Sequence, residues 1–497
     1  MKKIFLCILI IAGFSSCSKF LDQEPLSTST DDSFWKDEAE AESAIAGSYA
    51  LVRQAFNLVE GVSFFAYGDL VSDEILSSNL SDLGPVVQLN PTGYVPSGEP
   101  WRNLRRLRRF DLFYRAIDQA SRCIAFIPNI PASEFSSEEE RNRLIGEAYF
   151  LRAFNYFYMT RIWGDVPLVS GAVNVSSAVN LPRTPQAEVL SSCIKDIETA
   201  ISLLPWQYAS ASDKAVRANK GSAYALLAHL YAWMGEYEKC ALAADEVVKQ
   251  ETLYGFVSRD SLSYRGIYKG GSNEGVFEIA QSGENEGTIL GIGRFTLAAP
   301  YITGKTGVEI VIDSNTVYRM FPKGTTDKRF RSCFNLSNTA APMCTKYANI
   351  SYVGGGQSSA ATPLFRNNIV VFRYSDIYLL RAEALAATGQ YSAARTMLNK
   401  IRSLADATAV NIPDHLLFEE IIEERGRELF LEGHRFYDVI RLTRKDVSKV
   451  SFFGTTAIGP KMTTTDFLQG KYYWPLDPSL LNENKLLTQT PFWNSKI

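Results

Sequence analysis

A pattern of small and apolar residues occurs twice in the chain at a constant offset, and it constrains the fold more than any other feature. Each copy predicts a helix, a tight turn at a glycine, and a second helix that follows a tyrosine. The matching positions are Ala228, Tyr231, Gly235, Tyr237, Cys240, Ala244 and Val247 in the first copy and Ala382, Leu385, Gly389, Tyr391, Ala394, Leu398 and Ile401 in the second. Small residues where two antiparallel helices touch are typical of tetratricopeptide units, which stack on their neighbours. The sequence therefore predicts a scaffold of stacked helical pairs.

Other segments carry the same helical periodicity. In residues 147–163, apolar side chains recur at spacings of three and four, which predicts a helix with one buried stripe. The further helices predicted in this way are 39–56, 112–127, 187–203 and 417–431. We therefore expect an all-α dominated fold.

Long segments without a sustained period interrupt the scaffold. The scaffold covers about 39–56, 112–249 and 370–432, and the interruptions are 57–110 and 252–368. Loops of this length are uncommon in compact domains and usually carry function. We therefore expect the ligand site in these two segments, called the first and second insertions below.

The first residues predict export and lipid attachment. Two lysines and an apolar stretch (4–14) precede two serines and Cys17. This order is typical of a secretory signal, and its apolar core is shorter than the roughly 20 residues that cross a bilayer. A cysteine directly after small residues indicates a bacterial lipoprotein. We expect removal of 1–16, acylation of Cys17, and one domain over 17–497, because no Pro- or Ser-rich linker divides the chain.

Cysteine and histidine do not form a metal-binding pattern. The chain has 7 cysteines and 3 histidines, without a CxxC motif or a Cys/His ligand spacing. No metal or other cofactor is therefore expected. Cys333 and Cys344 lie in a loop-rich stretch, where a disulfide and two free thiols are both open alternatives.

Charge and motifs argue against two functional classes. The formal net charge is −3, and the one basic cluster, at 102–109, is interleaved with apolar residues, so we interpret it as a solvated helical face. A nucleic-acid partner is not expected, because such partners require a clustered basic excess. A Ser nucleophile elbow, an HExxH motif and a P-loop are all absent from the sequence, so no catalytic residue is predicted.

Charged residues near the C-terminal end imitate a catalytic pair. Glu428 and Glu432 are one helical turn apart, and they alternate with Arg425, Arg435 and Asp438. A glycosidase needs two carboxylates that flank a sugar in an open cleft, whereas this helix carries apolar neighbours. We interpret these residues as a buried or half-buried ion network.

Several sequence blocks resemble the SusD/RagB family, and they occur in the family's order over almost the whole mature chain. The blocks are CSKFLDQEP at 17–25, EAYFLRA at 147–153, WGDVPL at 163–168, NEGVFEI at 273–279, RYSDIYLLRAEA at 373–384, ERGRELFLEGHRFYD at 424–438 and WPLD at 474–477. The resemblance implies four tetratricopeptide-like pairs, a less regular ligand-binding part and a few short strands. It also implies a lipoprotein anchored at the surface of the outer membrane. Such a protein caps a SusC-like TonB-dependent transporter and delivers oligosaccharides to it.

A glycan site needs flat aromatic rings for the C–H faces of sugars and polar groups for their hydroxyls. In the first insertion the candidates are Trp101, Tyr94 and Asn79, with Trp101 preferred because it stands between Pro100 and Arg102 with little local core to join. In the second insertion the candidates are Asn285, Arg294, Phe295, Tyr301, Tyr347 and Tyr352. Loop aromatics also pin their own loops, so a structural role is the alternative for each residue.

Three other functions remain open at this point. The same fold is compatible with capture of peptides or glycopeptides. A glycoside hydrolase is a rival from another class, and a scaffold that binds only protein partners is a third. The sequence does not indicate which glycan would be recognised.

Overall fold

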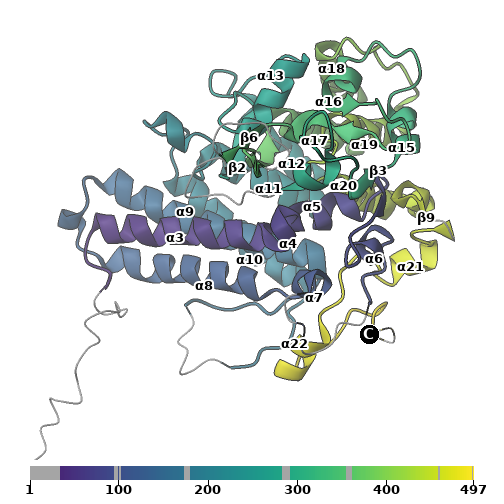
Figure 1. Ribbon diagram of the computed structural model, residues 1–497. Coiled ribbons are helices and arrows are strands. Elements are labelled where there is room, and N and C mark those ends of the chain that lie inside the picture. The colour runs from purple at the N-terminus through teal and green to yellow at the C-terminus, as the bar shows by residue number, and fades with distance from the viewer. Residues whose placement is uncertain are drawn as a thin grey trace, which may run out of the picture.

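The structure is a computed structural model of the chain (Figure 1). It describes residues 34–93, 99, 102–172, 179–281, 291–353, 361–456, 459–494 and 496. The expected signal sequence and Cys17 lie outside the described residues, as do Tyr94, Trp101 and Asn285.

Four antiparallel helical pairs form the scaffold, which confirms the predicted fold class. The pairs are α3 (Glu38–Phe56) with α8 (Asp111–Phe126), α9 (Glu138–Trp163) with α10 (Gln186–Leu203), α11 (Lys220–Met234) with α12 (Tyr237–Val248), and α17 (Tyr374–Ala387) with α18 (Tyr391–Leu404). Each pair packs on the next, through α8 on α9, α10 on α11 and α12 on α17. In Figure 1 the first helices extend to one side of the molecule, and the later pairs lie in its upper part.

The repeated sequence pattern explains the two later pairs. Gly235 and Gly389 end α11 and α17 with φ angles of +78° and +79°, a conformation that glycine adopts without a steric penalty. Ala228 and Ala394 are fully buried where the helices touch. At the start of α11, Asn219 accepts a hydrogen bond from the Ser222 N–H (2.9 Å) and so caps the helix.

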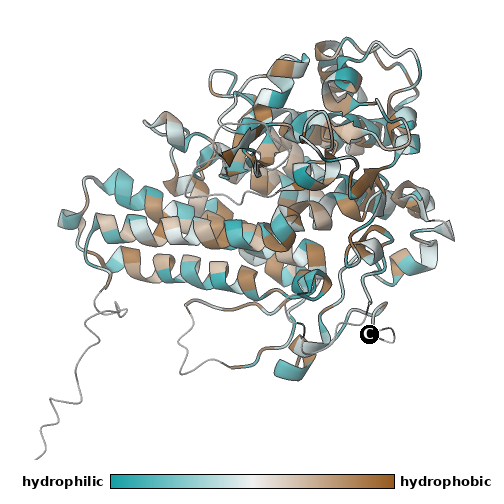
Figure 2. Ribbon diagram, in the orientation of Figure 1, coloured by the Kyte–Doolittle hydropathy of each residue, from teal (hydrophilic) through white to brown (hydrophobic). Residues whose placement is uncertain are grey.

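Helix α9 lies at the centre of the scaffold and is buried around most of its circumference. It packs on α3, α8 and α10, and its Phe154 ring contacts Phe56 and Phe277 at centroid distances of 5.7 and 5.3 Å. The outer helices α3 and α8 instead alternate hydrophobic and hydrophilic residues, as expected for helices with one exposed face (Figure 2).

The first insertion contains short helical segments that periodicity did not indicate. They are α4 (Leu58–Gly61), α5 (Ser63–Phe65), the π-helix η3 (Ala66–Leu70), α6 (Gly84–Val87) and α7 (Asn103–Leu107). Most residues from Leu58 to Ile75 are buried. Their partners lie far away in the sequence, so a local pattern could not indicate their burial.

Five two-stranded antiparallel sheets account for the strands in the described residues, in agreement with the few short strands expected. The strands are β1 (Ile75–Ser78), β2 (Gly275–Ile279), β3 (Ile310–Ile312), β4 (Phe334–Asn335), β5 (Met343–Cys344), β6 (Ile350–Tyr352), β7 (Pro363–Phe365), β8 (Ile369–Arg373), β9 (Thr455–Thr456) and β10 (Gly459–Pro460). The pairs are β1–β3, β2–β8, β4–β5, β6–β7 and β9–β10. The second insertion also carries α13 (Ser261–Gly266), η8 (Ile267–Lys269), α14 (Ile292–Thr296), α15 (Ser314–Met320), α16 (Lys328–Cys333) and η9 (Thr345–Tyr347).

The C-terminal part adds four helices: α19 (Leu417–Glu428), α20 (Arg435–Lys445), α21 (Thr464–Leu468) and α22 (Pro478–Glu483). Helix α19 corresponds to the predicted final helix and packs on α17 and α18. Among the described residues, no helix combines the length and the hydropathy that a membrane crossing would require.

The interpretation of the basic cluster at 102–109 as a solvated helical face is wrong, because its arginines form ion pairs and one of them is buried. Arg108 is buried and forms an ion pair with Asp477 (3.0 Å), and Arg109 pairs with Asp111 (2.7 Å) and Glu483 (2.9 Å). The pairs with Asp477 and Glu483 therefore fasten the first insertion to the C-terminal segment near α22.

The structure decides between the two alternatives for the cysteines. Cys333 and Cys344 are buried and free. They behave as small apolar core residues.

Candidate ligand-binding site

The two insertions that were expected to carry the site lie against each other. Strands β1 and β3 pair antiparallel, and the pairing continues where the Asn79 N–H donates to the Glu309 carbonyl at 2.8 Å. The Glu309 N–H in turn donates to the Phe295 carbonyl at 2.9 Å. Arg294 lies 3.8 Å from Glu60 of the first insertion. The structure therefore brings several candidates from both insertions into one region.

The same region reaches the residues that flank Trp101. Arg102 lies 3.3 Å from Asp82, and the Asn103 N–H donates to the other carboxylate oxygen of Asp82 at 3.2 Å. Glu99 also pairs with Arg102. Asp82 follows Asn79 by one short turn of the chain, so Arg102 and Asn103 are held near the β1–β3 pair.

Two of the aromatic candidates lie in the core and not at an open surface. Phe295 and Tyr347 are each 4% exposed. The Tyr347 hydroxyl donates to the Leu431 carbonyl at 2.6 Å, and its ring packs edge-on against Phe65 at 5.4 Å. The Tyr347 side chain finds its partners in distant segments, which its polar local sequence did not indicate.

Two further tyrosines stabilise the second insertion. The Tyr352 hydroxyl accepts a hydrogen bond from the Thr303 N–H at 3.1 Å, and its side chain is buried. Tyr301 is half-buried, and its hydroxyl accepts from the Asn335 side-chain amide at 3.2 Å. Both tyrosines therefore hold their own loops in place, which is the structural role that the sequence left open for loop aromatics. Tyr301 remains partly exposed.

Asn79 and Arg294 are the exposed candidates among the described residues. The Asn79 side chain is positioned by its backbone bond to Glu309, and Arg294 lies over the Phe295 ring at 5.6 Å. An amide that follows β1 and a guanidinium on α14 can donate hydrogen bonds to sugar hydroxyls.

A shallow polar recess lies between the insertions. Its walls include Phe65, Gln281, Gly291 and Asn367, and its free volume is only about 10 Å³. The side-chain oxygen of Asn367 is buried and has no hydrogen-bond partner in the part of the chain that the structure describes. The recess can therefore supply a hydrogen-bond acceptor, but it is too small to enclose a sugar.

A buried ion network anchors the second insertion to α19. Glu428 lies 2.7 Å from Arg259, 2.8 Å from Arg373 and 3.0 Å from Arg329, and Glu432 lies 2.6 Å from Lys346. Burial alone would raise the pKa of the Glu428 carboxyl, but the neighbouring guanidinium groups outweigh it and hold that pKa well below its usual range.

This network confirms the interpretation of the charged residues at 424–438. Arg425 pairs with Asp438 (2.8 Å) and Asp376 (2.9 Å), and Arg435 pairs with Asp73 (2.8 Å), all in the interior. Glu428 and Glu432 are buried among cations and face no cleft, so they do not have the geometry of a glycosidase pair.

One group of potential metal ligands occurs among the described residues. His229, Asp376 and His434 have ligand atoms within 4.8 Å of one another, and all three are buried. The His229 Nε2 atom already forms a hydrogen bond with Asp376 (2.9 Å), and Arg425 holds the other carboxylate oxygen. The imidazole rings stack instead of converging on a point (centroids 5.7 Å apart), so the group fits a cation poorly.

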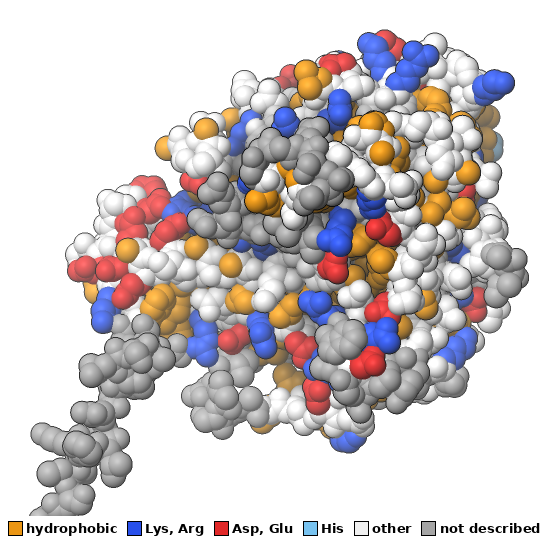
Figure 3. Space-filling view, in the orientation of Figure 1, with side chains coloured by type: hydrophobic (Ala, Val, Ile, Leu, Met, Phe, Trp, Pro, Cys, Tyr) orange, Lys and Arg blue, Asp and Glu red, His pale blue; other side chains and the backbone are white. Residues whose placement is uncertain are grey.

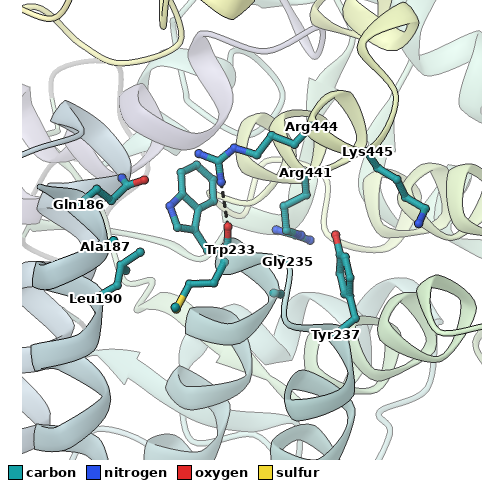
Figure 4. Close-up of a pocket in the computed structure, with 11 residues that line it drawn as sticks. Gln186, Ala187, Leu190, Trp233, Gly235, Tyr237, Arg441, Arg444 and Lys445 are labelled. Atoms are coloured by element: carbon teal, nitrogen blue, oxygen red, sulfur yellow. Dashed lines mark hydrogen bonds between the residues drawn. The ribbon is translucent and has the colours of Figure 1, made fainter.

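A larger cavity, of about 520 Å³, lies on the scaffold between α10, α11, α12 and α20 (Figure 4). Its lining includes Trp233, Tyr237, Arg441 and Arg444. The sequence pattern located the turn before Tyr237, but it did not indicate that α20 approaches this turn.

Stacked tetratricopeptide-like pairs with anchored insertions define this chain as a helical-repeat protein. Comparisons with known proteins identify the class further. A model of the SusD family matches residues 309–493, and a model described as "Starch-binding associating with outer membrane" matches residues 19–232.

Individual relatives agree with these matches. SusD-like protein P38 of Formosa agariphila is 27% identical, over 98% of this chain and 97% of its own length. A crystal structure of a SusD homolog from Bacteroides thetaiotaomicron is 27% identical, with a TM-score of 0.80 over 92% of this chain and 98% of that chain. A second SusD superfamily structure from that organism is 28% identical, with a TM-score of 0.78.

The chain belongs to the SusD-like family, as the sequence blocks predicted. The family consists of binding proteins and is described as associated with the outer membrane.

Proposed function

We propose that this protein captures oligosaccharides outside the cell and delivers them, unchanged, to a SusC-like TonB-dependent transporter in the outer membrane. The observation that carries the proposal is the β1–β3 pairing, which joins the two insertions into one surface on a helical frame. The description of the matching family model as starch-binding supports glycan as the ligand. The lipid on Cys17 would hold the protein at the membrane.

Recognition would use stacking and hydrogen bonds. Trp101 and Tyr94 would supply ring faces for the sugar, and Asn79, Asn285 and Arg294 would supply hydrogen-bonding groups. The contacts of Arg102 and Asn103 with Asp82 support a site in this part of the first insertion, because groups that are already fixed lose little conformational entropy on binding. Delivery requires release, so we expect affinities in the micromolar range or weaker, about −8 kcal/mol or less favourable.

Titration calorimetry with a panel of plant, host and microbial oligosaccharides tests the proposal. At least one glycan class should bind, and Trp101→Ala should weaken binding by about fivefold or more, since a stacked ring contributes about 1–3 kcal/mol. The matched control is Trp206→Ala, which removes a scaffold tryptophan that stacks on Tyr224 and should leave affinity unchanged.

Two further arms separate the alternatives. Chromatography of the incubated glycans should show no new reducing ends, and their appearance would indicate a hydrolase. A peptide library should give no binders, and peptide binding that Trp101→Ala abolishes would assign the same surface to peptides. If neither the glycan panel nor the peptide library contains a ligand that binds, the proposal is wrong.

A further inference from the structure

The scaffold cavity lies outside the two insertions and has the size of a ligand pocket. Its volume of about 520 Å³ falls within the range of about 300–1,000 Å³ that is typical of small-molecule sites. It is open to solvent on one side and bordered by the first turn of α10, the turn between α11 and α12, and the last turns of α20 (Figure 4). Leu190 and Met234 provide an apolar wall.

The polar lining of the cavity is basic. It contains Arg441, Arg444 and Lys445 and no carboxylate. Arg441 is neutralised by Glu383 (2.7 Å) and Asp438 (2.8 Å). Arg444 and Lys445 are exposed, and neither has an ion-pair partner within the described ranges. Two uncompensated cations beside a concave surface attract anions.

Arg444 is held in one orientation. Its guanidinium lies over the Trp233 ring, 4.0 Å from the ring centroid, and Nη1 donates to the Trp233 carbonyl at 2.8 Å. Figure 4 shows this stack at one edge of the cavity. A guanidinium has five N–H donors, so several remain for a ligand. A fixed side chain also loses little entropy when it binds.

Tyr237 adds a hydroxyl group to the opposite wall. Its ring packs edge-on against Phe418 at 5.8 Å, and among the described residues its hydroxyl has no hydrogen-bond partner. In Figure 4 this hydroxyl lies on the same side of the cavity as the Arg441 guanidinium. Burial raises the pKa of Tyr237, so the hydroxyl stays protonated and can donate.

We propose that this cavity is a second ligand site, which binds an acidic sugar unit through its carboxylate or sulfate group. Arg444 would bind the anionic group, Tyr237 would bind a ring hydroxyl, and Leu190 and Met234 would contact the C–H face. Lys445 lies beyond Tyr237, with its ammonium 5.2 Å from the Phe418 ring centroid, and would add to the positive potential without touching the anion. The choice of a sugar rests on the proposed function, whereas the site uses none of the residues proposed there. Neutral sugars would lack the charge-assisted contacts and bind weakly.

Titration calorimetry at low ionic strength tests this site with four probes. They are a disaccharide that contains glucuronic acid, its neutral glucose counterpart, a sulfated disaccharide and sodium sulfate. At least one acidic disaccharide should bind at least tenfold more tightly than the neutral one, since charged hydrogen bonds contribute about 1.5–3 kcal/mol. Its affinity should fall as salt is added.

Variants locate the site. Arg444→Gln and Tyr237→Phe should each weaken binding of the acidic probe by fivefold or more, and Lys445→Gln should weaken it less, because Lys445 lies beyond Tyr237. The control is Lys249→Gln, which also removes one positive charge. Lys249 follows the end of α12 that lies away from the cavity and pairs with Asp245, so this change should leave the affinity for the acidic probe unaltered. Trp101→Ala should leave this binding intact.

The outcomes are distinguishable. Equal affinity of the cavity variants and the wild type would overturn the second site while oligosaccharide capture at the insertions still stands. Sulfate binding as tight as the acidic disaccharide would also overturn it, since the sugar would then contribute nothing. Absence of binding by every oligosaccharide would overturn both proposals.

Discussion

At the scale of single residues, buried charges hold the second insertion on the frame. The single carboxylate of Glu428 contacts three guanidinium groups, those of Arg259, Arg329 and Arg373. Removing one partner of a buried ion network leaves uncompensated charge in the interior. We predict that Glu428→Gln lowers the free energy of unfolding by about 3–5 kcal/mol in urea denaturation.

An exposed ion pair provides the control for this prediction. Lys328 and Asp406 pair at 2.6 Å with side chains that are 51% and 57% exposed. Asp406→Asn should cost less than about 1 kcal/mol, because solvent screens such pairs. Similar losses for the two variants would show that the interior network does not have the stabilising role assigned to it.

A second residue-scale prediction concerns pH. Burial raises the pKa of Glu278 to about 7, and Asn368 donates to one of its carboxylate oxygens at 2.8 Å. The unfolded chain releases this proton near pH 4.5, whereas the folded chain keeps it up to about pH 7. The contribution of Glu278 to stability is therefore fully present below pH 4.5 and is lost as the pH rises to about 7.

Glu278→Gln should remove this pH dependence. The glutamine oxygen can still accept from Asn368, and the side chain carries no charge. Relative to wild type, the variant should gain roughly 3 kcal/mol between pH 4.5 and pH 8, measured by urea denaturation at several pH values. If the free energies of unfolding of the wild type and the variant differ by the same amount at every pH, the pKa of Glu278 is not raised.

At the scale of elements, a close backbone contact joins the first insertion to the C-terminal part. A Cβ atom on Gly68, in η3, would lie 2.6 Å from the Gly433 Cα atom. Gly68→Ala should therefore destabilise the protein by about 3 kcal/mol or more. Gly47 lies within α3 and has open space around it, so Gly47→Ala should stabilise by about 0.5–1 kcal/mol. Thermal unfolding of both variants measures the two effects, and equal shifts would contradict the close contact.

The elements also show what the sequence could predict. The pairs α11–α12 and α17–α18 follow from local periodicity and from Gly235 and Gly389, so their positions were predictable. The helical segments from Leu58 to Leu70 were not, because their stability depends on contacts such as Gly68 with Gly433. Local propensity carries no information about such distant partners.

The sequence singled out the segments 57–110 and 252–368 for the candidate site, and the β1–β3 pair shows that these segments contact each other. It did not indicate how their side chains pack. Tyr347, by contrast, was expected at the ligand and is buried against Phe65 and Leu431. The scaffold cavity was missed because Arg444 and Tyr237 approach each other only in the folded chain.

At the scale of the whole molecule, buried ions fix the second insertion to the helical frame, and we propose a lipid anchor at Cys17. The anchor has its own test. Cys17→Ser should move the protein from the membrane fraction to the soluble fraction of the producing cells, because no acylated cysteine remains. A variant that stays in the membrane fraction would contradict lipidation at this residue.

The most direct test of the central claim is a crystal structure of the protein with the oligosaccharide that binds most tightly. The account predicts an intact glycan at the surface where the insertions meet, with a sugar ring on Trp101 and hydrogen bonds from Asn79 or Arg294. A glycan bound elsewhere while this surface stays empty would contradict the account, and so would a cleaved product.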